Sequence, residues 1–218
     1  MERYVDIKEI SDGKLYSSND LVKADCGDCE GCHDCCWGMG ESIVLDPLDV
    51  NRLSAGLGKT FEELLGKYLE LNVVDGLILP NLKMQGAKEQ CSFLTEEGRC
   101  SIHTIRPGIC RLFPLGRFYE NGSFQYFLQV HECRKENRAK IKIKKWIDMT
   151  DVKRYEKFIN DWHYFMKDME KHVAQGFEYA RTISMYILKQ FYYQAYDEKE
   201  DFYQQFERRL DEAKQVFR

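Results

Sequence analysis

Cysteine is the residue type whose number and spacing point most directly to chemistry in this chain. The 218-residue sequence has nine cysteines, and the eleven residues CGDCEGCHDCC, from Cys26 to Cys36, hold five of them. A C-x-x-C step brings two sulfurs to one ion through a tight turn, and Gly27 and Gly31 help these turns to close. Chance is a poor explanation for such a dense run, so the pattern predicts metal ligation.

The spacing leaves the type of metal open. Repeated C-x-x-C steps resemble the ligand run of iron–sulfur proteins more than a zinc finger, which usually has separated cysteine pairs. Zinc stays an alternative, because both metals accept four thiolates. Side chains of neighbouring residues diverge, so Cys35 and Cys36 are not expected to serve one ion equally. One of them reaches a second metal or is a buried thiol without metal.

Acidic side chains are interspersed among these cysteines, and residues 25–36 contain no lysine or arginine. A reactive thiolate of low pKa needs a positive environment, which this loop provides only when a cation is bound. The composition of the loop therefore favours a metal site over a bare redox or nucleophilic cysteine.

A second group of cysteines lies in CSFLTEEGRCSIHTIRPGIC, at Cys91, Cys100 and Cys110. Its spacings of nine and ten residues are too long for one turn, so these ligands are expected on different segments that the fold gathers. Cys133 follows just after a strand-like run. His103 is an alternative ligand, since imidazole suits zinc and some iron centres, but a capping or hydrogen-bonded structural role is the preferred interpretation.

Basic residues accompany and follow the second group. Arg106, Arg111 and Arg117 would offset the negative charge of metal-bound thiolates or bind an anionic substrate, and a salt bridge to the acidic cysteine loop is the preferred interpretation. The run RKENRAKIKIKK, at 134–145, has no aromatic side chain interleaved to stack bases. A solvated strand or linker is therefore expected there, rather than a nucleic-acid contact.

The overall composition sets broad limits on function. Lys plus Arg is 32 and Asp plus Glu is 36, and the formal net charge of −4 gives no general attraction to nucleic acid or anionic membrane. No run approaches the roughly 20 apolar residues that span a bilayer, and the N-terminal residues lack the apolar core of a signal peptide. We therefore expect a cytoplasmic protein without a membrane partner. In that compartment an odd number of cysteines argues against a disulfide framework.

The elements that position the first cysteines are expected to be short. Residues 25–40 have the composition of a loop, and a capping box at Thr60 and Glu63 supports a helix after it. The expected elements are a helix that begins at Asp46–Pro47, one from Thr60 to about Leu71, strands at 76–79, 90–94 and 124–130, and a turn of helix at 104–112.

The last third of the chain is helical in pattern. After Thr150, which can cap a helix, apolar residues recur at spacings of three and four and draw one stripe: Val152, Tyr155, Phe158, Ile159, Trp162, Phe165, Met166 and Met169. Further helices are expected at about 173–195 and 198–216. The predicted fold is therefore α+β and loop-rich: an N-terminal segment at 1–25, a metal-organised cysteine-cluster domain with short strands at 26–147, and a helical extension at 148–218.

The runs CEGCHDCC, from Cys29 to Cys36, and CSFLTEEGRCSIHTIRPGICRLFP, from Cys91 to Pro114, resemble the YkgJ-type cysteine cluster family, also called the CxxCxxCC zinc- or iron-chelating domain. The resemblance covers about residues 26–147. It implies these metal ligands: Cys29, Cys32, Cys35, Cys36, Cys91, Cys100 and Cys110.

Two further cysteines fit the family pattern less well. Many members have a late Cys-Pro-Gly, which Cys133 would match as a metal ligand, but Arg134 and Lys135 replace the Pro-Gly here. Cys26 lies outside the family motif and is either an extra ligand or a spare thiol.

The residues and the resemblance leave three functions open. The first is an iron–sulfur protein, with one or more 4Fe-4S clusters, in a redox or protein-modifying role. The second is a zinc-bound structural or interaction module that holds a protein partner. The third is a lysine N-methylase that uses S-adenosylmethionine, because the resemblance extends distantly to flagellin lysine N-methylases. The sequence shows no glycine-rich strand–turn–helix for that cofactor.

Overall fold

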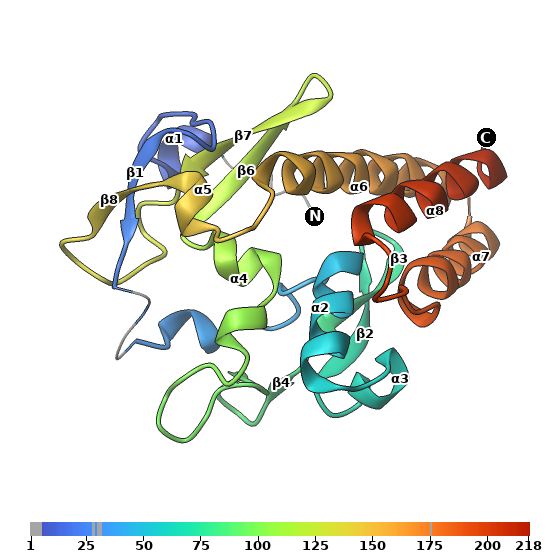
Figure 1. Cartoon of the computed structure of the whole chain (residues 1–218), viewed down its shortest axis with the longest axis horizontal. Helices are drawn as coiled ribbons and strands as arrows, with labels where there is room; N and C mark the ends of the chain where they lie inside the picture. Colours follow the sequence, from blue (N-terminus) through green and yellow to red (C-terminus); the bar gives the residue numbers. More distant parts are fainter. Residues whose placement is uncertain (1–5, 28, 30–31, 175) are drawn as a thin grey trace. The chain divides into compact units, whose positions relative to one another are not determined.

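The structure is a computed structural model that describes residues 6–27, 29, 32–174 and 176–218. Short helices alternate with two-stranded antiparallel sheets, and longer helices follow toward the C-terminus (Figure 1). This confirms the predicted α+β class with a helical C-terminal region. No helix in the described part of the chain is long and apolar enough to cross a bilayer.

The chain divides into two compact units, and each unit combines two stretches of sequence. Unit 1 consists of Met1–Gly40 and Met84–Glu156, and unit 2 of Glu41–Lys83 and Lys157–Arg218. All nine cysteines belong to unit 1. The domain boundary predicted near residue 147 stays a prediction.

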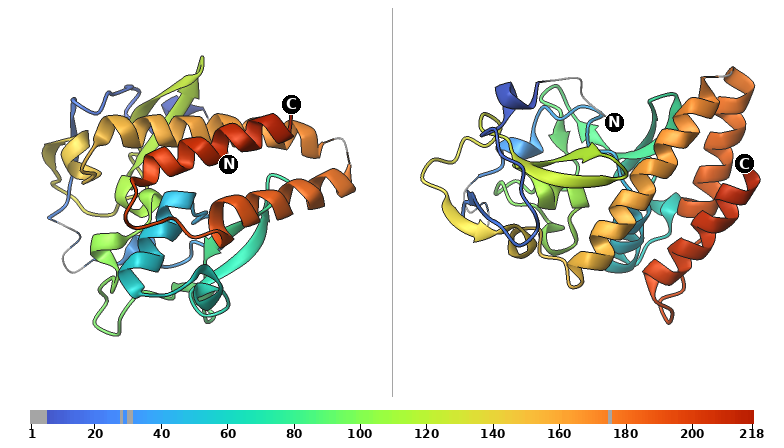
Figure 2. Two further views of the ribbon diagram at one scale, coloured as in Figure 1. Left: turned by 45° about the vertical axis from the view of Figure 1, so that its right-hand side comes forward. Right: turned by 90° about the horizontal axis from the view of Figure 1, so that it is seen from above.

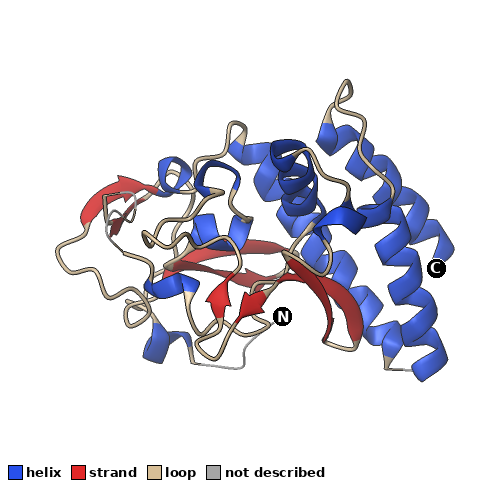
Figure 3. Cartoon of the chain, turned by 90° about the horizontal axis from the view of Figure 1, so that it is seen from below, coloured by secondary structure: helices blue, strands red, loops and turns tan. Residues whose placement is uncertain are grey.

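Unit 1 contains antiparallel strand pairs, one of which joins segments distant in sequence while the others are local hairpins (Figure 3). The pairs are β1 (Leu21–Asp25) with β8 (Ala139–Lys142), β4 (Met84–Gln85) with β5 (Gln90–Cys91), and β6 (Leu115–Glu120) with β7 (Ser123–Leu128). The helical elements are α1 (Ile7–Ile10), the 3-10 turns η1 (Asp34–Cys36) and η2 (His103–Ile105), α4 (Gly108–Leu112) and α5 (Ile143–Trp146). Strand β8 lies in the basic run and is mostly exposed, as expected for a solvated strand.

Unit 2 combines an early hairpin with the C-terminal helices. Its elements are α2 (Pro47–Leu57), α3 (Phe61–Leu64), β2 (Leu69–Val74), β3 (Leu77–Leu82), most of α6 (Val152–Val173), α7 (Phe177–Leu188), the π-helical turn η3 (Lys189–Tyr193) and α8 (Phe202–Val216). Helices α6 and α8 run alongside each other (Figure 2), and the rings of Phe158 and Phe206 meet edge to face with centroids 4.6 Å apart. The Tyr192 hydroxyl donates to the Leu45 carbonyl at 2.9 Å, which ties η3 to the chain before α2.

Both predicted N-terminal helix caps in unit 2 are confirmed, but one predicted helix is too long. Asp46 caps α2, and Thr60 and Glu63 form the capping box of α3. Helix α3 ends at Leu64 and does not continue to Leu71, because residues 69–74 pair with β3 as strand β2. Cross-strand packing in this hairpin outweighs the local helical pattern.

The short elements of unit 1 were only partly predictable. Helix α4 and strand β7 confirm the turn of helix at 104–112 and the strand near 124–130. The strand expected at 90–94 is shorter: it ends at Cys91, because the Leu94 N–H donates back to the Cys91 carbonyl at 3.0 Å and turns the chain.

The C-terminal helices are confirmed with shorter bounds. The α6 stripe is buried except at Val152, which is half-buried. The cap of α6 was assigned wrongly: the Asp151 carboxylate accepts from the Arg154 N–H at 3.2 Å, so Asp151 caps the helix in place of Thr150. The second and third helices begin later than expected, at Phe177 and Phe202.

Candidate metal centre

The first cysteine segment, Cys26–Cys36, leaves the end of β1 and turns at its cysteine steps. Cys29 has a left-handed backbone with φ of 57°, and its carbonyl accepts from the Cys32 N–H at 3.0 Å. The sulfurs of Cys26 and Cys29 lie 3.5 Å apart. Turn η1 then carries the last two cysteines of the segment. The loop expected at 25–40 is thus an irregular chain with one 3-10 turn, in the part that the structure describes.

The second cysteine segment, residues 89–101, reverses direction between two of its cysteines. Cys91 lies in β5, opposite Met84. The Thr95 N–H donates to the Arg99 carbonyl at 2.8 Å, and Cys100 forms a β-bridge with Leu94. The reversal returns Cys100 toward Cys91, so a spacing of nine residues becomes a short separation in space.

Backbone pairing joins the two cysteine segments. The Gly38 N–H donates to the Glu89 carbonyl at 3.1 Å, and Trp37 forms a β-bridge with Gln90. The residues just after Cys36 therefore run beside the residues just before Cys91, which places both segments in one site.

Side-chain contacts also hold the two cysteine segments together, at the turn of the second segment. The Arg99 guanidinium donates to the Cys29 carbonyl at 3.2 Å. Gly98 has φ of 74°, and a Cβ atom there would lie 2.8 Å from Nδ1 of His33. A side chain at residue 98 would thus be strained by the backbone and would meet the His33 ring. The glycine lets the first segment approach closely.

Seven thiols from the two segments influence one another electrostatically: Cys26, Cys29, Cys32, Cys35, Cys36, Cys91 and Cys100. Burial raises the pKa of Cys29 to about 12, and the neighbouring Cys26 adds to this effect. Burial is also the main cause that raises the pKa of Cys91 and of Cys100. A cation among the sulfurs would have the opposite effect, because it favours the thiolate form. The donor set therefore fits a thiophilic metal.

Cys35 is an exception among these thiols. A hydrogen bond from the Cys36 thiol lowers the pKa of Cys35 to about 7, although burial opposes the shift. The same hydrogen bond, together with burial, raises the pKa of Cys36 above its usual range. In the absence of metal, Cys35 is therefore the thiol of this pair that ionises.

We expect Cys35 to react with iodoacetamide at lower pH than Cys29 in reduced, metal-free protein. The thiolate is the reactive form, so near pH 8 Cys35 is mostly reactive and Cys29 is mostly protonated. Peptide mass spectrometry after brief labelling at several pH values measures the order. Loss of the Cys36 thiol in Cys36→Ala should shift labelling of Cys35 to higher pH. Equal labelling of Cys29 and Cys35 throughout would contradict the assignment.

Arg106 supplies positive charge to the site and engages His103. Burial raises the pKa of Cys100, and the Arg106 guanidinium counteracts this rise. Nη1 of Arg106 lies 2.8 Å from Nδ1 and 2.9 Å from Nε2 of His103, and it donates to the His103 carbonyl at 2.8 Å. These contacts agree with the hydrogen-bonded role preferred for His103. The salt bridge expected with the acidic loop stays a prediction, and two acidic residues of that loop, Asp28 and Glu30, lie outside the described residues.

Arg111 is fully buried and holds the backbone around α4. Its guanidinium donates to the carbonyls of Thr104, Arg106 and Asp148, the last two at 3.1 and 3.3 Å. Nη1 also lies 3.5 Å from the Asp148 carboxylate, but that side chain is 81% exposed, so the ion pair contributes little. Arg111 is therefore mainly a donor to buried backbone carbonyls.

Replacing Arg111 with methionine is expected to lower the free energy of unfolding of unit 1 by about 3 kcal/mol or more. The methionine fills part of the volume but leaves three carbonyls without their donor. Urea denaturation followed by circular dichroism measures the change. The control Asp148→Asn removes only the exposed charge and should cost less than about 1 kcal/mol. Equal losses in the two variants would show that the ion pair dominates.

The remaining predicted ligands lie on other elements. Cys110 is on α4, and Cys133 lies in the loop between β7 and β8. The ligand set predicted from the family pattern stays a prediction. Cys26, which that set omits, lies against Cys29, and the regular spacing of three residues was its signal in the sequence.

The nine cysteines, all of which are described, form no disulfide. Within the described residues, no three His, Cys, Asp or Glu side chains are already close enough together to hold one ion.

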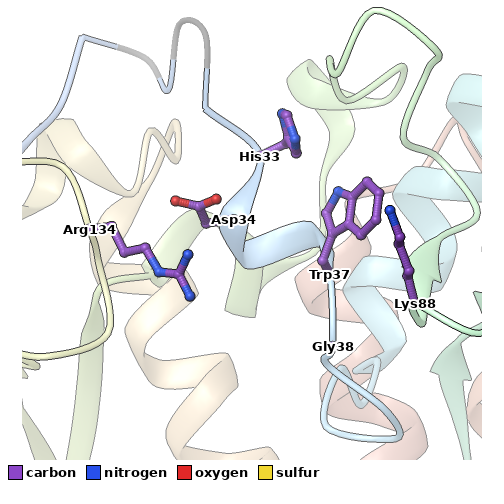
Figure 4. Close-up of a pocket in the computed structure, with 6 residues that line it drawn as sticks. All are labelled: His33, Asp34, Trp37, Gly38, Lys88 and Arg134. Carbon is purple, nitrogen blue, oxygen red and sulfur yellow. The ribbon is translucent and has the colours of Figure 1, made fainter.

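An open hollow of about 480 Å³ lies beside the first cysteine segment (Figure 4). Its lining residues are His33, Asp34, Trp37, Gly38, Lys88 and Arg134. Nζ of Lys88 lies 5.2 Å from the centre of the Trp37 ring, on the opposite side of the hollow from Asp34 and Arg134. The hollow gives solvent access to the chain on both sides of η1.

Thiols gathered from two segments define this chain as a metal-binding cysteine-cluster protein. A sequence model of the CxxCxxCC family, described as "Putative zinc- or iron-chelating domain", matches residues 28–138, just over half of the chain. The chain belongs to this family, as the resemblance predicted. Comparisons with curated proteins and with solved structures find no match.

Proposed function

We propose that the protein carries iron–sulfur clusters on its cysteines, in a redox or protein-modifying role. The main support is the number of thiols that interact in unit 1, which exceeds the four ligands of a structural zinc site. Iron–sulfur clusters take four cysteines each, so nine cysteines suffice for two centres. A bound cluster would supply electron transfer. The partly buried thiols would hold it, and Arg106 would offset part of its negative charge.

Metal and acid-labile sulfide content of protein purified without oxygen tests this proposal. We expect brown protein with a broad visible absorption band and with iron and sulfide in matching amounts. Colourless protein with stoichiometric zinc and no sulfide would overturn the iron–sulfur assignment and leave the metal-binding role.

A zinc-bound interaction module is the alternative, and the close approach of the Cys26 and Cys29 sulfurs favours it. The cysteines would then be a scaffold, and the helices of unit 2 would provide the surface for a protein partner. Because metal binding and folding are coupled in such sites, a chelator should unfold unit 1. A metal-free protein that keeps its melting transition would exclude this alternative.

Lysine methylation is a third proposal, and it rests on the family resemblance alone. It requires saturable binding of S-adenosylmethionine. Isothermal calorimetry on the iron-loaded and zinc-loaded forms measures this binding, and flat titrations of both forms would exclude the proposal.

A further inference from the structure

We propose that Cys26 is a metal ligand and that it shares a single thiophilic ion, such as Zn²⁺ or Fe²⁺, with Cys29. The proposal rests on the metal-binding role of the cysteine cluster and extends it to a residue outside the matched family region, which begins at residue 28.

The separation of the two sulfurs carries the proposal. Sγ of Cys26 and Sγ of Cys29 lie 3.5 Å apart. Two thiolates on one tetrahedral ion, with metal–sulfur bonds of about 2.3 Å, have sulfurs about 3.8 Å apart. A disulfide would need about 2.05 Å. The pair is thus within a few tenths of an ångström of the spacing that one shared ion requires.

The backbone of Cys29 is held in the conformation that gives this separation. Its φ of 57° is left-handed, a conformation that residues other than glycine adopt only where their surroundings hold them in it. Its carbonyl accepts hydrogen bonds from the Cys32 N–H at 3.0 Å and from Arg99 at 3.2 Å, and these bonds stabilise the turn. Contacts from both cysteine segments therefore fix Cys29 beside Cys26.

A bound ion would join the two sulfurs more strongly than they can interact with each other. In metal-free protein the pair can form only a weak S–H···S contact. An ion between the sulfurs would replace that contact with two metal–thiolate bonds.

The distance between the two sulfurs is also too short for two ligands of one four-iron cluster. Such a cluster is held by four cysteines, one on each iron, so its cysteine sulfurs are kept apart by the cluster itself. Two sulfurs in direct contact instead suit one shared ion. Any cluster in the protein would then use cysteines other than this pair, and five of the seven interacting thiols remain for it.

Metal and sulfide analysis of Cys26→Ala and Cys29→Ala, beside wild-type protein, tests the proposal. The control is Leu21→Ala, an exposed change on β1 that leaves every thiol in place. We expect both cysteine variants to lose one metal equivalent while acid-labile sulfide stays at the wild-type level. Zn²⁺ titration of the metal-free proteins should show binding at this site weakened by at least about 100-fold, since loss of an outer partner alone costs 10–100-fold.

The possible outcomes distinguish failure of this proposal from failure of the proposed metal-binding function. If Cys26→Ala keeps the metal content and Zn²⁺ affinity of Leu21→Ala, Cys26 is not a ligand. If sulfide falls together with metal, Cys26 serves a cluster, and the single-ion assignment is wrong. If wild-type protein binds neither iron nor zinc, the metal-binding function itself fails. Circular dichroism of the metal-free variants, and Cys26→Ser as an isosteric replacement, distinguish loss of a ligand from loss of folding.

Discussion

Cys35→Ala is expected to strip the cysteine site of metal and to lower the melting temperature of unit 1. Cys35 is the thiol with the most influence on the others: it affects the pKa of Cys29, Cys32, Cys36, Cys91 and Cys100. Removal of so central a donor should weaken metal affinity by at least about 100-fold. Because structural metal can supply about 10 kcal/mol of folding free energy, the loss should also destabilise the fold.

Metal analysis and calorimetric melting, on protein purified without oxygen, measure both effects. Cys133→Ala is the comparison, because Cys133 lies in the loop after β7 and matches the family pattern only in part. We expect a smaller loss there than at Cys35. Wild-type metal content in Cys35→Ala would show that the site is built around other thiols.

Removal of residues 157–218 is expected to make unit 2 unfold and the shortened chain precipitate. A chain that ends at Glu156 keeps all of unit 1 but loses the helices that cover residues 41–83. Phe61 contacts the rings of Tyr192 and Tyr193, and the Ile78 N–H donates to Ser184. Each large apolar side chain that is uncovered costs about 1.5–3 kcal/mol. Several such losses together equal or exceed the free energy of unfolding of a whole domain, which is about 5–15 kcal/mol.

Size-exclusion chromatography and the soluble fraction after expression measure this result. Supplying residues 157–218 as a separate chain is the control, and it should restore solubility if the missing contacts are the cause. A shortened chain that is monomeric, folded and metal-bound would instead show that the helical extension is separable.

The predictable parts of the fold are those with local causes. The Asp46–Pro47 helix start and the Thr60–Glu63 capping box each involve residues at most three positions apart, so both are predictable from the sequence. The buried stripe of α6 likewise follows from its helical period. The pairing of β1 with β8 joins residues more than a hundred positions apart, and no local pattern specifies its register.

The candidate site was likewise predictable only in part. The cysteine spacing pointed to metal and to ligands gathered from different segments. The means of gathering could not be predicted, because the β-bridge of Trp37 with Gln90 and the approach of His33 to Gly98 are contacts between distant segments. The sequence suggested a salt bridge from Arg111 to the acidic loop, and only the structure identifies this residue as a buried donor to backbone carbonyls.

The interleaving of the two units sets an order of events during synthesis on the ribosome. The chain passes from one unit to the other after Gly40, Lys83 and Glu156. The first cysteine segment therefore emerges well before Cys91 and Cys100, and at about 5–20 residues per second its thiols wait several seconds for their partners. An ion that arrives in this interval meets an incomplete set of donors. A complete set of cysteine ligands is available to a metal ion only after the second cysteine segment has been synthesised. Until then the thiols of the first segment must stay reduced.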